Sequence, residues 1–320
     1  MDERNSASMK PEILISTSSF GHINRQPLEM LESFGAAYRL NPFGRTLKPE
    51  ETMALLEGVD GLIAGTELLD RNVLSCAPNL KVISRCGTGL DNVDLEAAAK
   101  FGIRIYNTPE ALADGVSELA LAGILNVLRR VSYADRLIRQ GQWEKPMGWL
   151  LRGKTVGIVG LGRIGKALVK LLQPFLVTVL AHDPVQDEAF AHQYGVQYCP
   201  LDVLLAQADI VTLHLTYSSE CYHLLDRSRL AAMKPGAILV NCARGGLVDE
   251  QALYEFLKAG KLAGAYLDVF EQEPYRGPFT ELANVILTSH IGSYAAECRL
   301  RMEVEAVGNL LRYFREEAGR

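Results

Sequence analysis

One stretch of the chain, Thr155-Val-Gly-Ile-Val-Gly-Leu-Gly-Arg-Ile-Gly165, limits the possible fold more than any other. Its first five residues form an apolar, β-branched run, which is typical of a buried parallel strand. Gly160, Gly162 and Gly165 follow, and residues 163–172 have the pattern of a helix that ends near Pro174. The glycines allow a tight turn, a close approach of backbone to an anion, and close packing of helix on strand. The stretch therefore predicts a strand, a turn and a helix whose free N–H groups hold an anionic group.

A carboxylate follows at about the spacing that a dinucleotide site requires. Residues 177–181 predict a second strand, and Asp183 comes just after it, 18 residues beyond Gly165 (183 − 165). A carboxylate there accepts hydrogen bonds from the ribose of an adenosine and repels a 2′-phosphate. The alternative is a glycine-rich turn beside an unrelated surface aspartate, because glycine triplets are common in loops. We predict a dinucleotide site that takes NAD rather than NADP.

The length and composition predict two globular domains without extreme charge. A chain of 320 residues with 48% apolar and 22% charged residues can bury two cores. The net charge of −5 and the lack of a basic run make nucleic acid an unexpected partner. The six scattered cysteines form no C-x-x-C pair, so we expect neither zinc nor a disulfide framework, and a cytoplasmic protein. Neither a signal peptide nor contact with a membrane is expected.

Short apolar segments alternate with helical segments through both halves of the chain. In the first half the expected strands are residues 12–17, 38–40, 61–64, 81–84 and 103–106. In the second half, the strands expected after residues 155–159 and 177–181 are residues 208–213, 237–241, 263–267 and 285–288. This alternation predicts two α/β units with doubly wound parallel sheets, whose ligands lie at the carboxyl ends of the strands. Residues 116–140, between the halves, have the pattern of one long helix.

Polar residues gather where several of these strands end. The sequences concerned are Asn241-Cys-Ala-Arg-Gly-Gly246, Asp268-Val-Phe-Glu-Gln-Glu-Pro274 and Ser289-His-Ile-Gly-Ser293. Taken singly, Arg244 could be a surface salt-bridge partner, Glu273 a solvated side chain and His290 an ordinary loop histidine. Because they share one sheet edge, they can supply a carboxylate-binding fork, a carboxylate and an imidazole together. That set suits hydride transfer to a 2-oxo acid.

Several of these motifs resemble those of the D-2-hydroxyacid dehydrogenases, most closely the phosphoglycerate-dehydrogenase-like branch. The matching sequences are Arg85-Cys-Gly-Thr-Gly-Leu-Asp-Asn-Val-Asp94, Asn107-Thr-Pro109, the Gly160 stretch, Asn241-Cys-Ala-Arg-Gly-Gly-Leu-Val-Asp249, residues 268–274 and His290-Ile-Gly292. The resemblance implies a flavodoxin-like substrate domain that is split into residues 1–106 and 294–320. It also implies that a Rossmann-type NAD-binding domain, residues 107–293, is inserted between the two parts.

The resemblance further implies roles for individual residues. Arg244 would bind the substrate carboxylate, His290 would exchange a proton with the substrate oxygen, and Glu273 would pair with His290 and favour its protonated form. The residues that would hold the substrate carboxylate from the other domain are Cys86, Gly87, Thr88 and Gly89. The residues that would contact NAD are Thr88, Gly160, Gly162, Arg163, Ile164, Gly165, Asp183, Leu215, Cys242, Ala243, Arg244, Asp268, His290 and Gly292. No metal is expected.

The chain departs from the family pattern at two places. Thr216 stands where the family usually has the proline of a His-x-Pro strand end. Ala64, followed by Gly65, Thr66 and Glu67, stands where phosphoglycerate dehydrogenases have a phosphate-binding arginine, so we expect an unphosphorylated 2-oxo acid. The alternatives are a phosphoglycerate dehydrogenase proper and an NAD(H)-sensing binding protein like the corepressors of this scaffold. Family members dimerise through the long helix and the segment after it, so we expect a homodimer with Trp143 near its interface.

Overall fold

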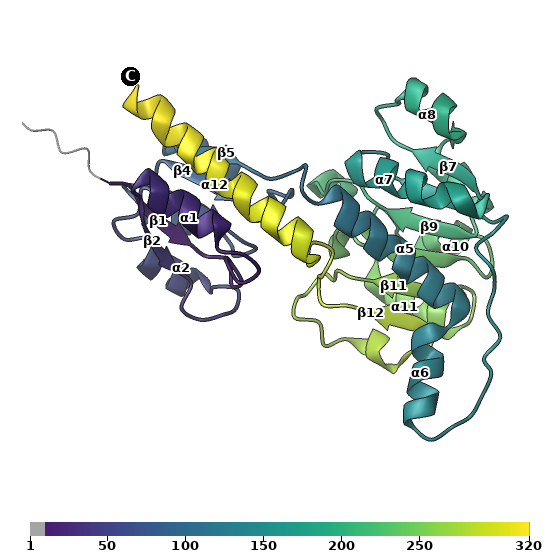
Figure 1. Cartoon of the computed structure of the whole chain (residues 1–320). Helices are drawn as coiled ribbons and strands as arrows, with labels where there is room; N and C mark the ends of the chain where they lie inside the picture. Colours follow the sequence, from purple (N-terminus) through teal and green to yellow (C-terminus); the bar gives the residue numbers. More distant parts are fainter. Residues whose placement is uncertain (1–9, 320) are drawn as a thin grey trace, which may run out of the picture. The chain divides into compact units, whose positions relative to one another are not determined.

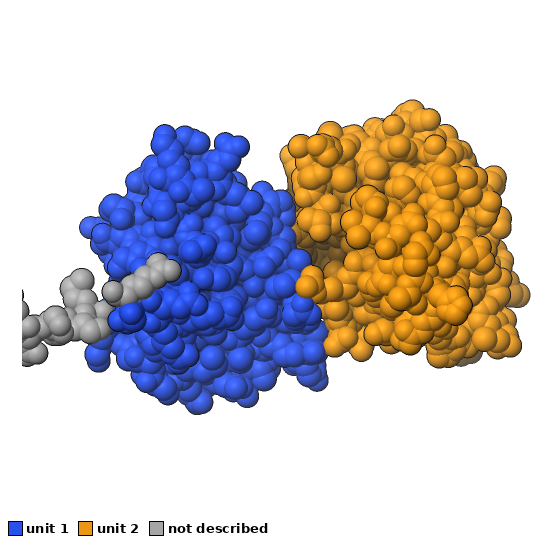
Figure 2. Space-filling model, turned by 90° about the horizontal axis from the view of Figure 1, so that it is seen from above, with its two compact units in different colours: residues 1–112, 295–320 blue, residues 113–294 orange. Residues whose placement is uncertain are grey.

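The computed structural model describes residues 10–319, which form two compact units (Figures 1 and 2). Unit 1 comprises residues 1–112 and 295–320, and unit 2 comprises residues 113–294. Unit 2 is therefore an insertion in unit 1. The division falls six residues after the first expected boundary (112 − 106) and one after the second (294 − 293).

Unit 1 contains a five-stranded parallel sheet. Its strands are β1 (Glu12–Ile15), β2 (Ala37–Leu40), β3 (Gly61–Ala64), β4 (Val82–Arg85) and β5 (Arg104–Tyr106). They lie in the order β2-β1-β3-β4-β5, with every neighbouring pair parallel. This 2-1-3-4-5 order is the flavodoxin-like arrangement, and it confirms the expected fold class of the split domain.

Helices cover both faces of this sheet. They are α1 (Gln26–Phe34), α2 (Pro49–Leu55), α3 (Arg71–Ser75), α4 (Leu95–Lys100) and α12 (Ala296–Ala318). The long C-terminal helix α12, yellow in Figure 1, packs against α1 and β4. On the other face, Leu14, Leu62 and Ile83 of the sheet form a fully buried core with apolar residues of α3 and α4. Apolar strands between two helical layers bury both faces, as parallel sheets require.

Unit 2 contains a seven-stranded parallel sheet. Its strands are β6 (Thr155–Val159), β7 (Thr178–His182), β8 (Val196–Tyr198), β9 (Ile210–Leu213), β10 (Ile238–Asn241), β11 (Gly264–Leu267) and β12 (Val285–Leu287). They lie in the order β12-β11-β10-β9-β6-β7-β8. The chain order thus reverses between β6 and β9, which is the switch point of a Rossmann sheet. Ligands of such sheets bind outside the carboxyl ends of the strands at that point.

Helices again form two layers around the sheet of unit 2. They are α5 (Ala113–Arg129), α6 (Val131–Arg139), α7 (Arg163–Leu172), α8 (Glu188–Tyr194), α9 (Leu201–Gln207), α10 (Arg227–Ala232) and α11 (Glu250–Lys258). Helix α5 packs on α7 and over β10 and β11 (Figure 1). Helix α10 contacts α9 and α11, and their buried leucines and alanines form a core with Leu239 and Leu267 of the sheet.

The prediction of one long helix over residues 116–140 is wrong. Helix α5 ends at Arg129, Arg130 takes a left-handed conformation with φ of 56°, and α6 then begins. The side chain of Asn126 stabilises the break, because it bonds both the amide and the hydroxyl of Ser132. Helix α8 and strand β8 were not predicted, since each buries only one residue, Ala191 and Val196, and so shows no clear apolar periodicity.

Three further findings concern the part of the chain that the structure describes. None of its helices has both the length and the apolar character that crossing a membrane requires. All six cysteines lie in residues 10–319, and none of them is in a disulfide. Over the same residues, no group of three or more histidine, cysteine or acidic side chains is arranged to hold a metal ion.

Candidate active site

The glycine stretch after β6 forms a close turn between strand and helix. Gly160 has a φ of +96°, and a Cβ there would lie 2.6 Å from the amide nitrogen of Leu215. A Cβ on Gly165 would lie 2.4 Å from the carbonyl oxygen of Gly160. At Gly162, the N-cap of α7, a Cβ would meet no atom of the described chain within 4 Å. Two glycines are thus required by close packing, and the third leaves open space at a helix N-terminus, which fits a pyrophosphate.

Asp183 follows β7 and supports the same turn. Its Oδ2 accepts a hydrogen bond of 2.7 Å from the amide of Leu161, and its Oδ1 accepts one of 2.8 Å from the amide of Val185. A carboxylate has about four acceptor positions, so two remain for hydroxyl groups of a ribose. The residues present therefore fit NAD.

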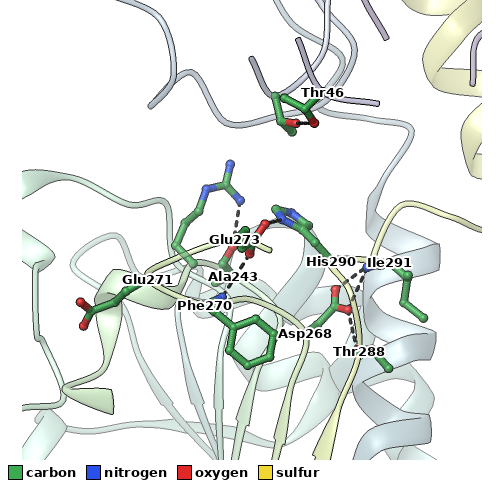
Figure 3. Close-up of polar contacts among 12 residues, drawn as sticks. Thr46, Ala243, Asp268, Phe270, Glu271, Glu273, Thr288, His290 and Ile291 are labelled. Carbon is green, nitrogen blue, oxygen red and sulfur yellow. Dashed lines mark hydrogen bonds and ion pairs between the residues drawn. The ribbon is translucent and has the colours of Figure 1, made fainter. Parts of the chain in front are cut away.

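The side chains of His290 and Glu273 form a pair near the carboxyl ends of β11 and β12 (Figure 3). Nδ1 of His290 lies 2.8 Å from Oε2 of Glu273, and each side chain is about one third exposed (34% and 37%). The amide of Phe270 donates to the other oxygen of Glu273 at 3.1 Å. Glu273 is therefore fixed by its own loop on one side and orients an imidazole on the other.

The pKa of Glu273 reflects two opposing effects. Burial alone would raise the pKa, but the hydrogen bond and charge of His290, the Phe270 amide and the charge of Arg244 outweigh it. The net result is a pKa below the ordinary value, so Glu273 is an anion at neutral pH. Both Arg244 and His290 therefore lie close enough to Glu273 to lower its pKa.

Asp268 holds the loop that carries His290 (Figure 3). This aspartate is 1% exposed, and it accepts hydrogen bonds of 2.8 Å from the amides of Ile291 and Gly292 and of 2.6 Å from Thr288 Oγ1. Its backbone carbonyl accepts from the amide of His290 at 2.8 Å. His290 has a φ of 57°, which a residue other than glycine adopts only when its surroundings enforce it. The geometry thus makes Asp268 a support of the His290 loop, and its predicted contact with NAD stays a prediction.

Arg244 lies on the loop after β10, and hydrogen bonds within this loop stabilise it. The side chain of Asn241 donates to the carbonyl of Arg244 at 2.8 Å and accepts from the amide of Ala243 at 3.0 Å. Nη1 of Arg244 donates to the carbonyl of Ala243 at 2.8 Å. A Cβ on Gly245 would lie 1.9 Å from the carbonyl carbon of Phe270, so this loop packs directly on the loop of Glu273.

The predicted substrate-binding loop, residues 86–89, belongs to unit 1. Gly87 has a φ of +145°, donates to Thr108 Oγ1 at 2.8 Å and accepts from the Thr108 amide at 3.0 Å. That φ lies in the region that favours glycine, and a Cβ on Gly87 would also displace the guanidinium of Arg85, which lies 1.2 Å from its position. Burial raises the pKa of Cys86 to about 12, so its thiol is un-ionised and only its backbone can bind an anion. Thr88 and Gly89 lie on the same loop, and Asn107 donates to the carbonyl of Thr88 at 2.8 Å.

The remaining predicted cofactor residues are in unit 2. Arg163 and Ile164 begin α7, Leu215 follows β9, and Cys242 is buried directly after β10. The sequence did not single out Thr288 or Tyr266. The hydroxyl of Tyr266 lies 2.8 Å from Thr288 Oγ1 and extends the hydrogen-bond chain that supports Asp268. A strand-end threonine just before the Ser289-His290 pair was the signal that could have indicated this support.

Comparisons with known proteins identify the family of this chain. Residues 121–292 match the family model of the D-isomer specific 2-hydroxyacid dehydrogenase NAD binding domain. The chain is 37% identical over 322 residues to a glyoxylate reductase of Thermococcus litoralis, covering 97% of this chain and 95% of that protein. It is 37% identical over 273 residues to a hydroxypyruvate reductase of Thermotoga maritima, covering 83% and 88% of the two chains. A D-3-phosphoglycerate dehydrogenase of Archaeoglobus fulgidus is 42% identical over 238 residues, which are 73% of this chain and 45% of that protein.

Solved structures give the same result. The TT0316 protein of Thermus thermophilus superposes with a TM-score of 0.86 at 38% identity, covering 94% of this chain and 96% of that chain. A D-lactate dehydrogenase of Aquifex aeolicus, complexed with NAD and lactic acid, superposes with a TM-score of 0.84 at 26% identity and 96% coverage of both chains. The predicted family, fold class and NAD cofactor are confirmed, and the chain belongs to the D-isomer specific 2-hydroxyacid dehydrogenases.

Proposed function

We propose that this chain is an NAD(H)-dependent enzyme that interconverts a small 2-oxo acid and its 2-hydroxy acid. The observation that carries the proposal is the 2.8 Å contact between His290 and Glu273, beside Arg244 and at the ligand-binding edge of a Rossmann sheet. This arrangement supplies a proton donor, an anion that favours its charged form and a cation for a carboxylate. The cofactor, when bound, supplies the hydride.

His290 is suited to exchange the proton. Its Nδ1 is engaged by Glu273, so Nε2 is the nitrogen that faces the substrate. In reduction the imidazolium donates its Nε2 proton to the 2-oxo oxygen as C2 gains the hydride, and in oxidation the neutral ring takes that proton back. Glu273 stays ionised and stabilises the imidazolium, so it acts as an orienting anion and not as a proton carrier.

Arg244 is suited to bind the substrate carboxylate. A guanidinium can donate two parallel hydrogen bonds to a carboxylate, which fixes the acid group and places C2 next to it. The Asn241 contacts and the close packing of Gly245 hold the loop in position before a substrate arrives.

The substrate that we propose is an unphosphorylated 2-oxo acid such as glyoxylate or hydroxypyruvate. The carboxyl end of β3 presents Ala64, Gly65 and Thr66, none of which is a cation. Glu67 is 2% exposed and directed inward, where Ser16 Oγ and the Gly65 amide donate to its carboxyl group. A desolvated phosphate dianion requires several paired donors, and this strand end offers no positive side chain. The names of two of the relatives, a glyoxylate reductase and a hydroxypyruvate reductase, support the same choice.

The test is NADH oxidation with a panel of 2-oxo acids. The panel would include glyoxylate, hydroxypyruvate, pyruvate, branched and aromatic acids, and 3-phosphohydroxypyruvate. Arg244→Gln should lower kcat/KM by about a hundredfold or more, because a charged carboxylate loses its partner. Arg152→Gln, at an exposed position of the same unit, is the matched control and should retain wild-type activity. A chain that binds NADH but oxidises it with no 2-oxo acid would instead be a binding protein of the corepressor kind.

A further inference from the structure

A second imidazole–carboxylate pair, formed by His223 and Glu271, has no part in the proposed reaction. Nε2 of His223 lies 2.6 Å from Oε1 of Glu271, and the side chains are 29% and 32% exposed. The ring of Tyr222 stacks on that of His223 with centroids 3.9 Å apart. Figure 3 shows the side chain of Glu271 two residues before Glu273 and pointing away from it.

His223 also contacts the loop that carries Arg244. Its amide donates to the carbonyl of Gly246 at 2.8 Å, and the next segment continues with a parallel bridge between Leu225 and Val248. The backbone of His223 is thus bonded to the Arg244 loop, and its ring is bonded to the Glu273 loop. Between these two loops, Gly245 packs against the backbone of Phe270 and Glu271 with no room for a Cβ.

The charges around the pair show why the contact matters. The amide of Glu271 donates to Oε1 of Glu250 at 2.8 Å, so a third carboxylate from α11 faces the same loop. Burial raises the pKa of Glu250, and the negative charges of Glu271 and Glu273 add to that rise, while His223 opposes it. The negative charge of Glu271, together with burial and the charge of Asp249, also raises the pKa of Tyr222. Two carboxylates thus belong to the 270–273 loop and a third accepts a hydrogen bond from its backbone, and the ring of His223 bonds directly to one of them, that of Glu271.

We propose that His223 is a positioning residue: by bonding Glu271 it holds the 270–273 loop against the Arg244 loop, and so keeps Glu273 in place under His290. This inference rests on the proposed function, because the effect of Glu273 on His290 matters only if His290 exchanges a proton. His223 acts through Glu273 and does not contact the substrate. Without the ring contact, the 270–273 loop loses its side-chain bond to the segment that is joined to the Arg244 loop, and a displacement of about 1 Å can cost up to about a hundredfold in rate.

The experiment compares His223→Ala, His223→Gln and Glu273→Gln with the wild type in glyoxylate or hydroxypyruvate reduction. We expect His223→Ala to lower kcat about tenfold, while the Kd of NADH stays within about twofold of the wild-type value. The decline of its reduction rate at alkaline pH should move to lower pH, as it should in Glu273→Gln. His223→Gln should recover kcat to within about threefold, because its amide can still donate to Glu271. In the Glu273→Gln background, His223→Ala should have less than about a twofold further effect, since residues that act through one contact are not additive. His192→Ala, on the exposed side of α8, is the matched control.

Three results would overturn the inference. They are an unchanged kcat in His223→Ala, a loss in His223→Gln as large as that in His223→Ala, or a full additional loss in the Glu273→Gln background. Nitrogen NMR of the His290 ring provides a readout without turnover, because its Nδ1 signal reports the bond to Glu273 in each variant. If the wild type reduces no 2-oxo acid, the proposed function fails, and the NMR comparison still decides whether His223 holds Glu273. Should His223→Ala not fold, Glu271→Ala tests the same contact from the other partner.

Discussion

Replacing Glu273 by glutamine should move the pH dependence of the reaction without removing the histidine. The variant loses the anion 2.8 Å from His290 Nδ1 and retains a group of nearly the same size. The anion stabilises the imidazolium, which is the form that donates the proton in reduction. Without it, the imidazolium is lost at lower pH, so the alkaline decline of reduction should move down. Oxidation needs the neutral ring, so its onset should move down as well.

The size of this movement can be worked from the geometry. Two unit charges about 4 Å apart interact by about 4 kcal/mol at an effective dielectric constant of about 20. Both side chains are about one third exposed (34% and 37%), so solvent screening reduces this to about 1 kcal/mol. One pH unit corresponds to about 1.4 kcal/mol, so we expect a movement of about 0.5–1 pH unit.

The assay is kcat/KM for glyoxylate reduction and for oxidation of the corresponding hydroxy acid, each across pH. Glu281→Gln removes a charge from an exposed position in the same unit and should leave both profiles unchanged. The pH dependence of protein stability provides an independent check. The pKa of Glu273 is lower in the folded than in the unfolded protein, so the ionised carboxylate stabilises the fold at any pH above the pKa of the unfolded state. This stabilisation is lost as the pH falls through the pKa of the folded state. The loss of stability in Glu273→Gln should therefore be largest at neutral pH and vanish in acid. Identical alkaline limbs in wild type and Glu273→Gln would refute the coupling of these two residues.

Four further outcomes are expected. The wild type should prefer NADH to NADPH, and Asp183→Ala should reduce that preference about tenfold, since the variant loses the charged acceptor for the ribose hydroxyls. Equal kcat/KM for the two cofactors in the wild type would contradict this. Hydroxypyruvate or glyoxylate should be reduced with higher kcat/KM than 3-phosphohydroxypyruvate, and a tenfold preference for the phosphorylated acid would mean that other residues hold the phosphate. Thr288→Val should lower the free energy of unfolding by about 1–3 kcal/mol by thermal or urea unfolding, because the Tyr266 hydroxyl and Asp268 lose a partner, whereas the exposed Thr178→Val should not. The protein should be a homodimer by light scattering, and Trp143→Glu, at a side chain 84% exposed in the single chain, should shift it toward monomer if that residue lies at the interface.

Much of the fold follows from local sequence patterns. Apolar runs such as Thr155–Val159 are long enough to identify buried strands, and the alternation with helices implies parallel sheets because each crossover returns the chain in the same direction. The glycine spacing identified the cofactor turn because close packing excludes any Cβ at Gly160 and Gly165. Local periodicity could not show that Arg130 adopts a left-handed conformation, because the break depends on particular contacts, such as those of Asn126 with Ser132.

The sequence by itself determined the fold class, the NAD cofactor and the identity of the candidate trio, since each depends on residue types at fixed positions relative to strand ends. Only the tertiary structure decided how those residues are supported. The 2.8 Å contact of His290 with Glu273 joins two loops 17 residues apart in the chain. His223 and Glu271 are 48 residues apart and meet only because β9, β10 and β11 lie side by side. Pairing between strands sets distances that no local spacing contains, so the contact of His223 with Glu271 could be recognised only in the folded chain.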